Sequence, residues 1–158
     1  MTRVETISRR VPILLAIALA HLASGAIAHG DEHPDAAYGR PGDAAKASRT
    51  VPIVMSDSMR FTPALITVRK GETIRFVLTN SGKVKHEMVV GSSKELKEHA
   101  ALMRKFPEME HADPNRVSVD PGKTGALIWQ FTRAGTFDFA CLQPGHFEAG
   151  MHGKIAVR

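Results

Sequence analysis

The C-terminal segment "DFACLQPGHFEAGMHGK" contains three potential metal donors at fixed intervals. Cys141, the only cysteine of the chain, is followed by His146 and Met151 in the spacing Cys-x4-His-x4-Met. Thiolate, imidazole and thioether groups are soft or borderline donors for metal ions. Pro144 and Gly145 favour a tight turn after the cysteine, and "FEAG" favours a second turn. We therefore expect the three donors to converge on one point.

A fourth donor is predicted from the upstream segment "KVKHEMVV". Alternation along a strand would place His86, Met88 and Val90 on one side, facing the core. Two imidazoles, one thiolate and a weak axial thioether form the ligand set of a blue-copper electron-transfer site. Thiolate and thioether favour Cu(I), whereas imidazole also accepts Cu(II). The predicted copper ligands are therefore His86, Cys141, His146 and Met151.

The elements that must position these donors have the pattern of an all-β domain. From Val51 onward, short segments alternate apolar and polar residues between turn signals, as in "ETIRFVLTN" and "GALIWQF". Period-two alternation places Ile74, Phe76 and Leu78 on one face of a strand. The pattern predicts a β-sandwich of seven to eight strands.

One helix is predicted within this β pattern, around residues 93–106. Ser92, with Glu95 three positions later, predicts a capping box at its start. Pro107 predicts its end. The apolar positions on one face of this helix are Leu96, Ala100 and Met103.

The N-terminal segment predicts export. A basic stretch is followed by the apolar run "VPILLAIALAHLASGAIA", which is too short and too interrupted for a membrane span. Ala26 and Ala28 form an A-x-A cleavage site, so residues 1–28 are predicted to be a signal peptide and His29 the first mature residue. The paired arginines near the start leave both the Sec and the twin-arginine routes open. We expect a periplasmic protein with no membrane span after cleavage.

The mature chain has the size and charge of one small domain. Removal of residues 1–28 leaves 130 of the 158 residues and lowers the net charge from +5 to +3, because that segment has three arginines and one glutamate. Residues 29–50 are polar and rich in Gly, Pro and Ala, which predicts a flexible arm before a domain over residues 51–158. No basic block is interleaved with aromatic residues, so nucleic acid is not an expected partner.

The predicted mature N-terminus "HGDEH" is a candidate for a second copper site. The freed α-amine and the imidazole of His29 belong to one residue and can chelate Cu(II), and His33 can add a further nitrogen. The alternative is a solvated arm whose histidines bind no metal.

The phrase "KHEMV" and the Cys-x4-His-x4-Met loop resemble the cupredoxin family of type 1 copper proteins. The loop length is similar to those of rusticyanin and auracyanin, and the helix and histidine-bearing N-terminus look most like periplasmic copper-tolerance cupredoxins. The resemblance covers residues 51–158 and implies a Greek-key β-sandwich with copper near one end. Many cupredoxins have Asn or Ser after the first histidine, tying the ligand loops together, whereas this chain has Glu87.

The sequence is compatible with two functions. The first is copper tolerance, in which the bound copper ion cycles between Cu(I) and Cu(II). Its expected partner is a periplasmic redox or copper-handling protein. The second is an electron shuttle between respiratory proteins. Catalysis is not expected, because a multicopper oxidase or nitrite reductase needs additional histidine pairs. In either case we expect docking around His146, beside Leu142 and Phe147.

Overall fold

A computed structural model of the chain describes residues 36–109 and 112–158, which belong to the unit His33–Arg158. Ten strands are present among the described residues: β1 (Arg40–Pro41), β2 (Arg49–Ser56), β3 (Arg60–Thr62), β4 (Leu65–Val68), β5 (Thr73–Asn80), β6 (His86–Gly91), β7 (Arg116–Val119), β8 (Thr124–Gln130), β9 (Gly135–Ala140) and β10 (His152–Val157). A short 3-10 helix spans Ala44–Lys46, and one α-helix, α1, spans Ser93–Lys105.

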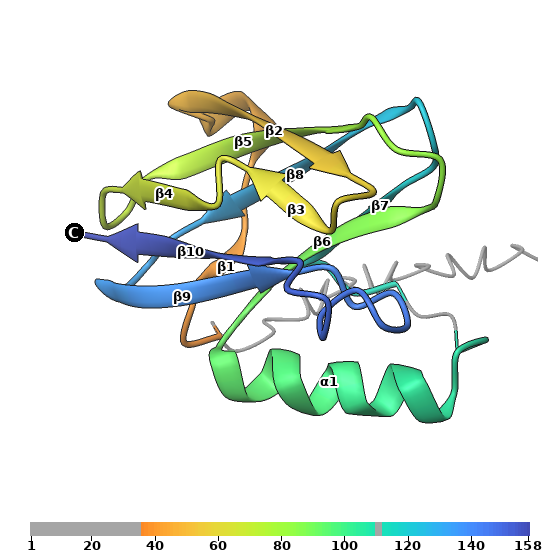
Figure 1. Cartoon of the computed structure of the whole chain (residues 1–158). Helices are drawn as coiled ribbons and strands as arrows, with labels where there is room; N and C mark the ends of the chain where they lie inside the picture. The colour runs from red at the N-terminus through yellow and green to blue at the C-terminus, as the bar shows by residue number, and fades with distance from the viewer. Residues whose placement is uncertain (1–35, 110–111) are drawn as a thin grey trace, which may run out of the picture. The chain divides into compact units, whose positions relative to one another are not determined.

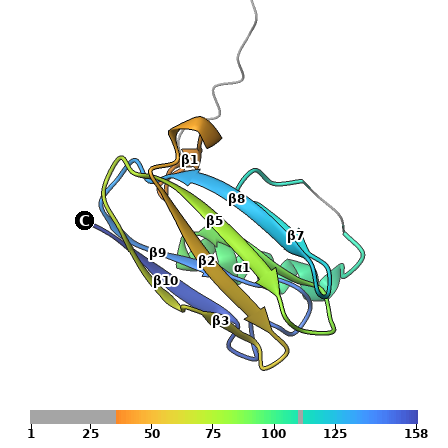
Figure 2. The same ribbon diagram turned by 90° about the horizontal axis from the view of Figure 1, so that it is seen from above.

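The strands form two five-stranded sheets packed face to face (Figures 1 and 2). The first has the order β1-β8-β5-β2-β3 and the second β4-β10-β9-β6-β7. Most neighbours are antiparallel, but β2 pairs parallel with β5 and β4 pairs parallel with β10. The predicted all-β sandwich is confirmed. It has more strands than predicted because β1 and β3 are too short to show an alternating pattern.

The core between the sheets follows the predicted alternation. Ile74, Phe76 and Leu78 of β5 are fully buried, whereas Arg75 between them is exposed. The ring of Phe76 meets that of Phe131 edge to face, with their centroids 6.2 Å apart. This apolar cluster between the sheets holds the sandwich together without a disulfide.

The predicted helix is also confirmed, including its cap. The Ser92 side chain accepts a hydrogen bond from the backbone of Glu95, and the Glu95 side chain accepts one from the backbone of Ser92. Figure 1 shows α1 along the outer side of the second sheet. Leu96 packs there in a second apolar cluster with Val89 and Ala140. Strand β6 is therefore buried on both faces.

The predicted flexible arm is corrected for residues 36–50. Tyr38 stacks on Trp129 with ring centroids 5.7 Å apart, and the Trp129 Nε1–H donates to the Tyr38 carbonyl at 2.9 Å. Strand β1 pairs with β8, and β2 begins at Arg49. The indole needs both an apolar cover and an acceptor for its N–H, and this segment supplies both. The predicted second-site residues His29 and His33 lie outside the described residues.

Within residues 36–109 and 112–158, no helix is long and apolar enough to cross a membrane.

Candidate metal centre

The predicted donors lie where three strands of the second sheet meet one end of the sandwich. His86 begins β6, Cys141 directly follows β9, and Met151 directly precedes β10. Strand β9 is antiparallel to both β6 and β10. The start of β6, the end of β9 and the start of β10 therefore lie side by side.

The loop between Cys141 and Met151 folds back on itself through backbone hydrogen bonds. Met151 N–H donates to the His146 carbonyl, and Cys141 N–H donates to the Met151 carbonyl, both at 3.0 Å. Gly145 and Gly150 have φ angles of +83° and +94°, which glycine adopts without strain. The two tight turns predicted from the sequence are present.

Three donor atoms converge as a result. His86 Nδ1 lies 3.2 Å from His146 Nδ1, and Cys141 Sγ lies 3.3 Å from His146 Nδ1. The three ligand atoms all lie within 4.8 Å of one another. These separations suit donors that share one ion at about 2.0–2.3 Å, the bond lengths typical of nitrogen and sulfur on zinc. The donor set of imidazoles and thiolate also suits copper.

Burial differs among the four predicted ligands. His86, Cys141 and Met151 are fully buried, whereas His146 is partly exposed. Met151 lies in the same core cluster as Cys141, and its backbone is hydrogen-bonded to the backbones of Cys141 and His146. Of this group, His146 alone connects the buried donors with the surface.

Burial also shifts the protonation of the donors. Burial raises the pKa of Cys141 to about 12, although backbone N–H groups, including that of Glu87, donate to the sulfur and oppose the shift. Burial, and secondarily the charge of His86, lower the pKa of His146. The imidazole of His146 therefore stays neutral and available to a metal at lower pH than usual, whereas the thiol must lose its proton as the metal binds.

Glu87 ties the two ligand segments together. Its Oε1 accepts from the backbone N–H of Leu142 at 3.2 Å, and its Oε2 accepts from Ser118 and Gln143 at 3.1 and 3.2 Å. An Arg116 guanidinium nitrogen lies 3.7 Å from Oε2. This buried carboxylate thus makes the connection between ligand segments that the family resemblance implies for Asn or Ser at this position.

Asp57 is a contact that the sequence analysis missed. It lies in the turn between β2 and β3, and its Oδ1 is 3.1 Å from His86 Nε2. The pattern around it, "SDS", indicates only a polar turn. No local periodicity could have associated this turn with a histidine 29 positions later.

The predicted docking face also needs correction. Leu142 is only 1% exposed and packs in the apolar cluster under α1, with Phe147 half-buried against it. The Arg104–Glu148 ion pair, at 3.0 Å, joins α1 to the loop that carries His146. Buried Leu142 therefore does not line an exposed docking face, although His146 itself is partly exposed.

Comparison with known proteins agrees with this geometry. Residues 50–158 match the family described as copper binding proteins, plastocyanin/azurin family. A copper-resistant cuproprotein CopI from Rubrivivax gelatinosus is 61% identical over 135 residues, which cover 85% of this chain and 80% of that protein. The CopI of Pseudomonas aeruginosa is 36% identical over 175 residues, covering 92% and 93% of the two chains.

Solved structures show the same fold. Reduced auracyanin from Roseiflexus castenholzii superposes with a TM-score of 0.61 at 21% identity, covering 71% of this chain and 98% of its own. Auracyanin B gives a TM-score of 0.62 at 19% identity, covering 76% and 94%. The cupredoxin resemblance predicted from the sequence is confirmed, and the chain belongs to the plastocyanin/azurin family of copper-binding proteins.

Proposed function

We propose that this protein binds one copper ion in a type 1 site through His86, Cys141, His146 and Met151. The observation that carries the proposal is the convergence of the two imidazole nitrogens and the thiol sulfur. Backbone hydrogen bonds link Met151 to both His146 and Cys141. A bound copper ion would supply a one-electron Cu(I)/Cu(II) couple. The partly exposed His146 imidazole is the direct route between that ion and a partner.

We further propose that the site serves copper tolerance in the periplasm. Relatives that match 85% and 92% of this chain are named copper-resistant cuproproteins, and the N-terminal sequence has the features of a cleavable export signal. The protein acts as a copper binder and one-electron carrier and not as an enzyme, with a periplasmic redox or copper-handling protein as partner. An electron shuttle between respiratory proteins is the second candidate, since a one-electron Cu(I)/Cu(II) couple behind a partly exposed ligand would serve that role as well.

The copper site is tested by ligand substitution and absorption spectroscopy. Cys141→Ala removes the thiolate whose charge transfer to Cu(II) colours such sites, so the visible band and most of the copper affinity should disappear. His146→Ala should weaken binding, whereas His152→Ala is a matched control because His152 is exposed beside Phe147, outside the donor group. A Cys141→Ala protein with the wild-type band would overturn the type 1 assignment.

The biological role is tested in a deletion strain. Loss of the gene should make growth copper-sensitive, and the wild-type gene, but not Cys141→Ala, should restore tolerance. Normal copper tolerance combined with defective respiration would contradict this role and support the shuttle.

A second copper at the mature N-terminus, held by His29 and His33, is a separate proposal. It rests on the nitrogen-rich donor set that cleavage after Ala28 would create.

A further inference from the structure

We propose that Asp57 is a positioning residue for copper: it holds the His86 imidazole in the tautomer whose Nδ1 lone pair faces Cys141 and His146. This inference rests on the copper site proposed above. It adds a carboxylate that lies outside the ligand set and acts through the far nitrogen of one ligand.

The tautomer follows from the partners of the two ring nitrogens. Asp57 Oδ1 lies 3.1 Å from His86 Nε2, and an ionised carboxylate can only accept a hydrogen bond. The proton of the neutral ring therefore belongs on Nε2. Nδ1, which lies 3.2 Å from His146 Nδ1, is left with a lone pair pointing into the donor group. A hydrogen bond at one ring nitrogen commonly sets which nitrogen a metal binds.

The carboxylate is itself held in place. Asp57 Oδ2 accepts the backbone N–H of Lys83 at 2.7 Å, and this hydrogen bond is the main cause of the lowered pKa of Asp57. A Cβ at position 82 would collide with the carboxylate, so Gly82 is what allows this close approach. Ser81 donates to the Met55 carbonyl at the end of β2. The segment before His86 is thus fastened to the turn that carries Asp57.

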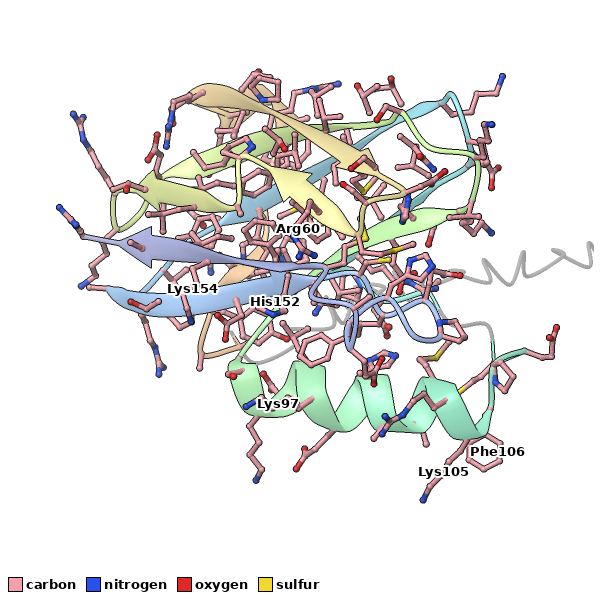
Figure 3. All side chains as sticks on the ribbon, in the orientation of Figure 1. Arg60, Lys97, Lys105, Phe106, His152 and Lys154 are labelled. Carbon is pink, nitrogen blue, oxygen red and sulfur yellow. The ribbon has the colours of Figure 1, made fainter. Side chains whose placement is uncertain are left out.

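The same turn is also hydrogen-bonded to the loop between Cys141 and Met151, here called the copper loop. An Arg60 guanidinium nitrogen donates to the carbonyls of Met59 at 2.7 Å and Ala149 at 3.0 Å. Figure 3 shows Arg60 between β3 and the loop that precedes β10. The turn from the first sheet therefore contacts both ligand-bearing segments of the second sheet.

A carboxylate on the far nitrogen makes the imidazole a stronger donor, and this favours Cu(II) more than Cu(I). Loss of such a partner commonly lowers metal affinity about 10–100-fold. We expect removal of Asp57 to lower Cu(II) affinity by that factor and Cu(I) affinity by less. Each tenfold difference between the two losses raises the reduction potential by about 59 mV.

Asp57→Asn is the sharpest variant. It keeps the shape, but its one carbonyl oxygen can accept from either His86 or Lys83, and its amide group must face the other donor. Asp57→Ala removes the interaction altogether. Glu148→Gln is the matched control, because it also removes one negative charge from the loop beside His146, while Glu148 pairs with Arg104 on α1.

Three measurements on the full chain test the proposal. Cu(II) and Cu(I) affinities come from competition with chelators, and the potential comes from redox titration. The His86 tautomer comes from ¹⁵N NMR of the metal-free protein at about pH 8, above the reference histidine pKa of about 6.5. Both Asp57 variants should lose at least tenfold in Cu(II) affinity and raise the potential, and the metal-free Nε2–H form should lose population. Glu148→Gln should match the wild type.

The proposal is overturned if the Asp57 variants shift affinity and potential no more than Glu148→Gln, or if the wild-type His86 proton lies on Nδ1. Failure of the copper site itself would be recognised separately, because the wild-type protein would then lack a Cys141-dependent band. Retention of the fold in each variant is checked by circular dichroism. Asp57 is partly exposed, with 40% of its side chain accessible, so both substitutions should fold.

Discussion

At the scale of single residues, Glu87 shows how a buried charge can connect two ligand segments. Among the described residues, its oxygens accept hydrogen bonds from the Leu142 N–H, the Ser118 hydroxyl and the Gln143 amide, and the Arg116 guanidinium lies nearby. A charged acceptor surrounded in this way is satisfied, whereas a neutral amide would bring its own N–H groups against those donors.

We therefore predict that Glu87→Gln destabilises the metal-free protein by about 1–3 kcal/mol. Urea denaturation followed by circular dichroism measures this change. Glu98→Gln is the control, because the Glu98 side chain is 66% exposed on α1. Equal denaturation midpoints for the two variants would show that the hydrogen bonds of Glu87 do not stabilise the protein.

The thiol of Cys141 predicts a pH dependence of stability. Its pKa in the fold is about 12, above the ordinary value of 9.0, because burial disfavours the thiolate. Below pH 9 the thiol keeps its proton in both the folded and the unfolded state, so the full free energy of unfolding is present. Above pH 9 the unfolded state loses the proton first, and the free energy of unfolding falls by up to about 1.4 kcal/mol per pH unit.

This decline should appear in denaturation curves of the metal-free protein between about pH 9 and 11. Cys141→Ala lacks the thiol, so its profile should fall less steeply over the same range. Parallel profiles would show that the thiol does not cause the loss.

Met151 is expected to tune the potential. Met151→Leu should keep a coloured site but raise the reduction potential, because loss of a weak axial donor destabilises Cu(II) more than Cu(I). Met88→Leu is the control, since Met88 is as fully buried but lies within β6. Redox titration separates the two, and an unchanged potential in Met151→Leu would remove Met151 from the ligand set.

At the scale of elements, α1 forms a second apolar cluster beside the copper loop. Leu96, Ala100 and Met103 cover Leu142, the residue after the cysteine. Figure 3 shows Lys105 and Phe106 at the far end of this helix. Because Leu142 is buried in this cluster, Leu142→Lys would place a charge in an apolar environment. The substitution would therefore disturb folding and would not report on docking. Docking is better tested at exposed positions around His146.

The helix cap gives the prediction at this scale. Ser92→Ala should lower stability by about 1 kcal/mol, because the Glu95 N–H loses its capping acceptor. Thermal denaturation measures the loss. Ser93→Ala, one position inside the helix and exposed, should change stability far less. If both substitutions cost the same, the capping box contributes nothing measurable.

At the scale of the whole molecule, the proposed second copper depends on cleavage of the N-terminal segment. Cleavage after Ala28 should yield a mature protein beginning at His29, which mass spectrometry would establish. Copper analysis should then give a second, colourless Cu(II), lost in His29→Ala and in a version with one extra residue before His29. Binding should weaken below about pH 6.5, where the imidazole gains a proton. Equal copper content in all three proteins would reduce the segment to a linker.

Features that depend on neighbours along the chain could be predicted from the sequence alone. Alternation in β5 defined a buried face, Ser92 and Glu95 defined the start of α1, and the spacing Cys141, His146 and Met151 defined the copper loop. Each of these patterns repeats a local geometry, of a strand, a helix turn or a tight turn. The same local reasoning extended the flexible arm too far, because residues 36–50 are ordered by distant partners.

The remote segments that support the donors could be identified only once the fold was known. Tyr38 covers Trp129, 91 positions away, Glu87 reaches Leu142 across 55 positions, and Asp57 reaches His86 from the other sheet. None of these pairs has a periodic signature, because each depends on how two sheets stack and where their turns meet. A polar residue in a turn looks like solvent-exposed sequence until the fold brings a ring nitrogen to it.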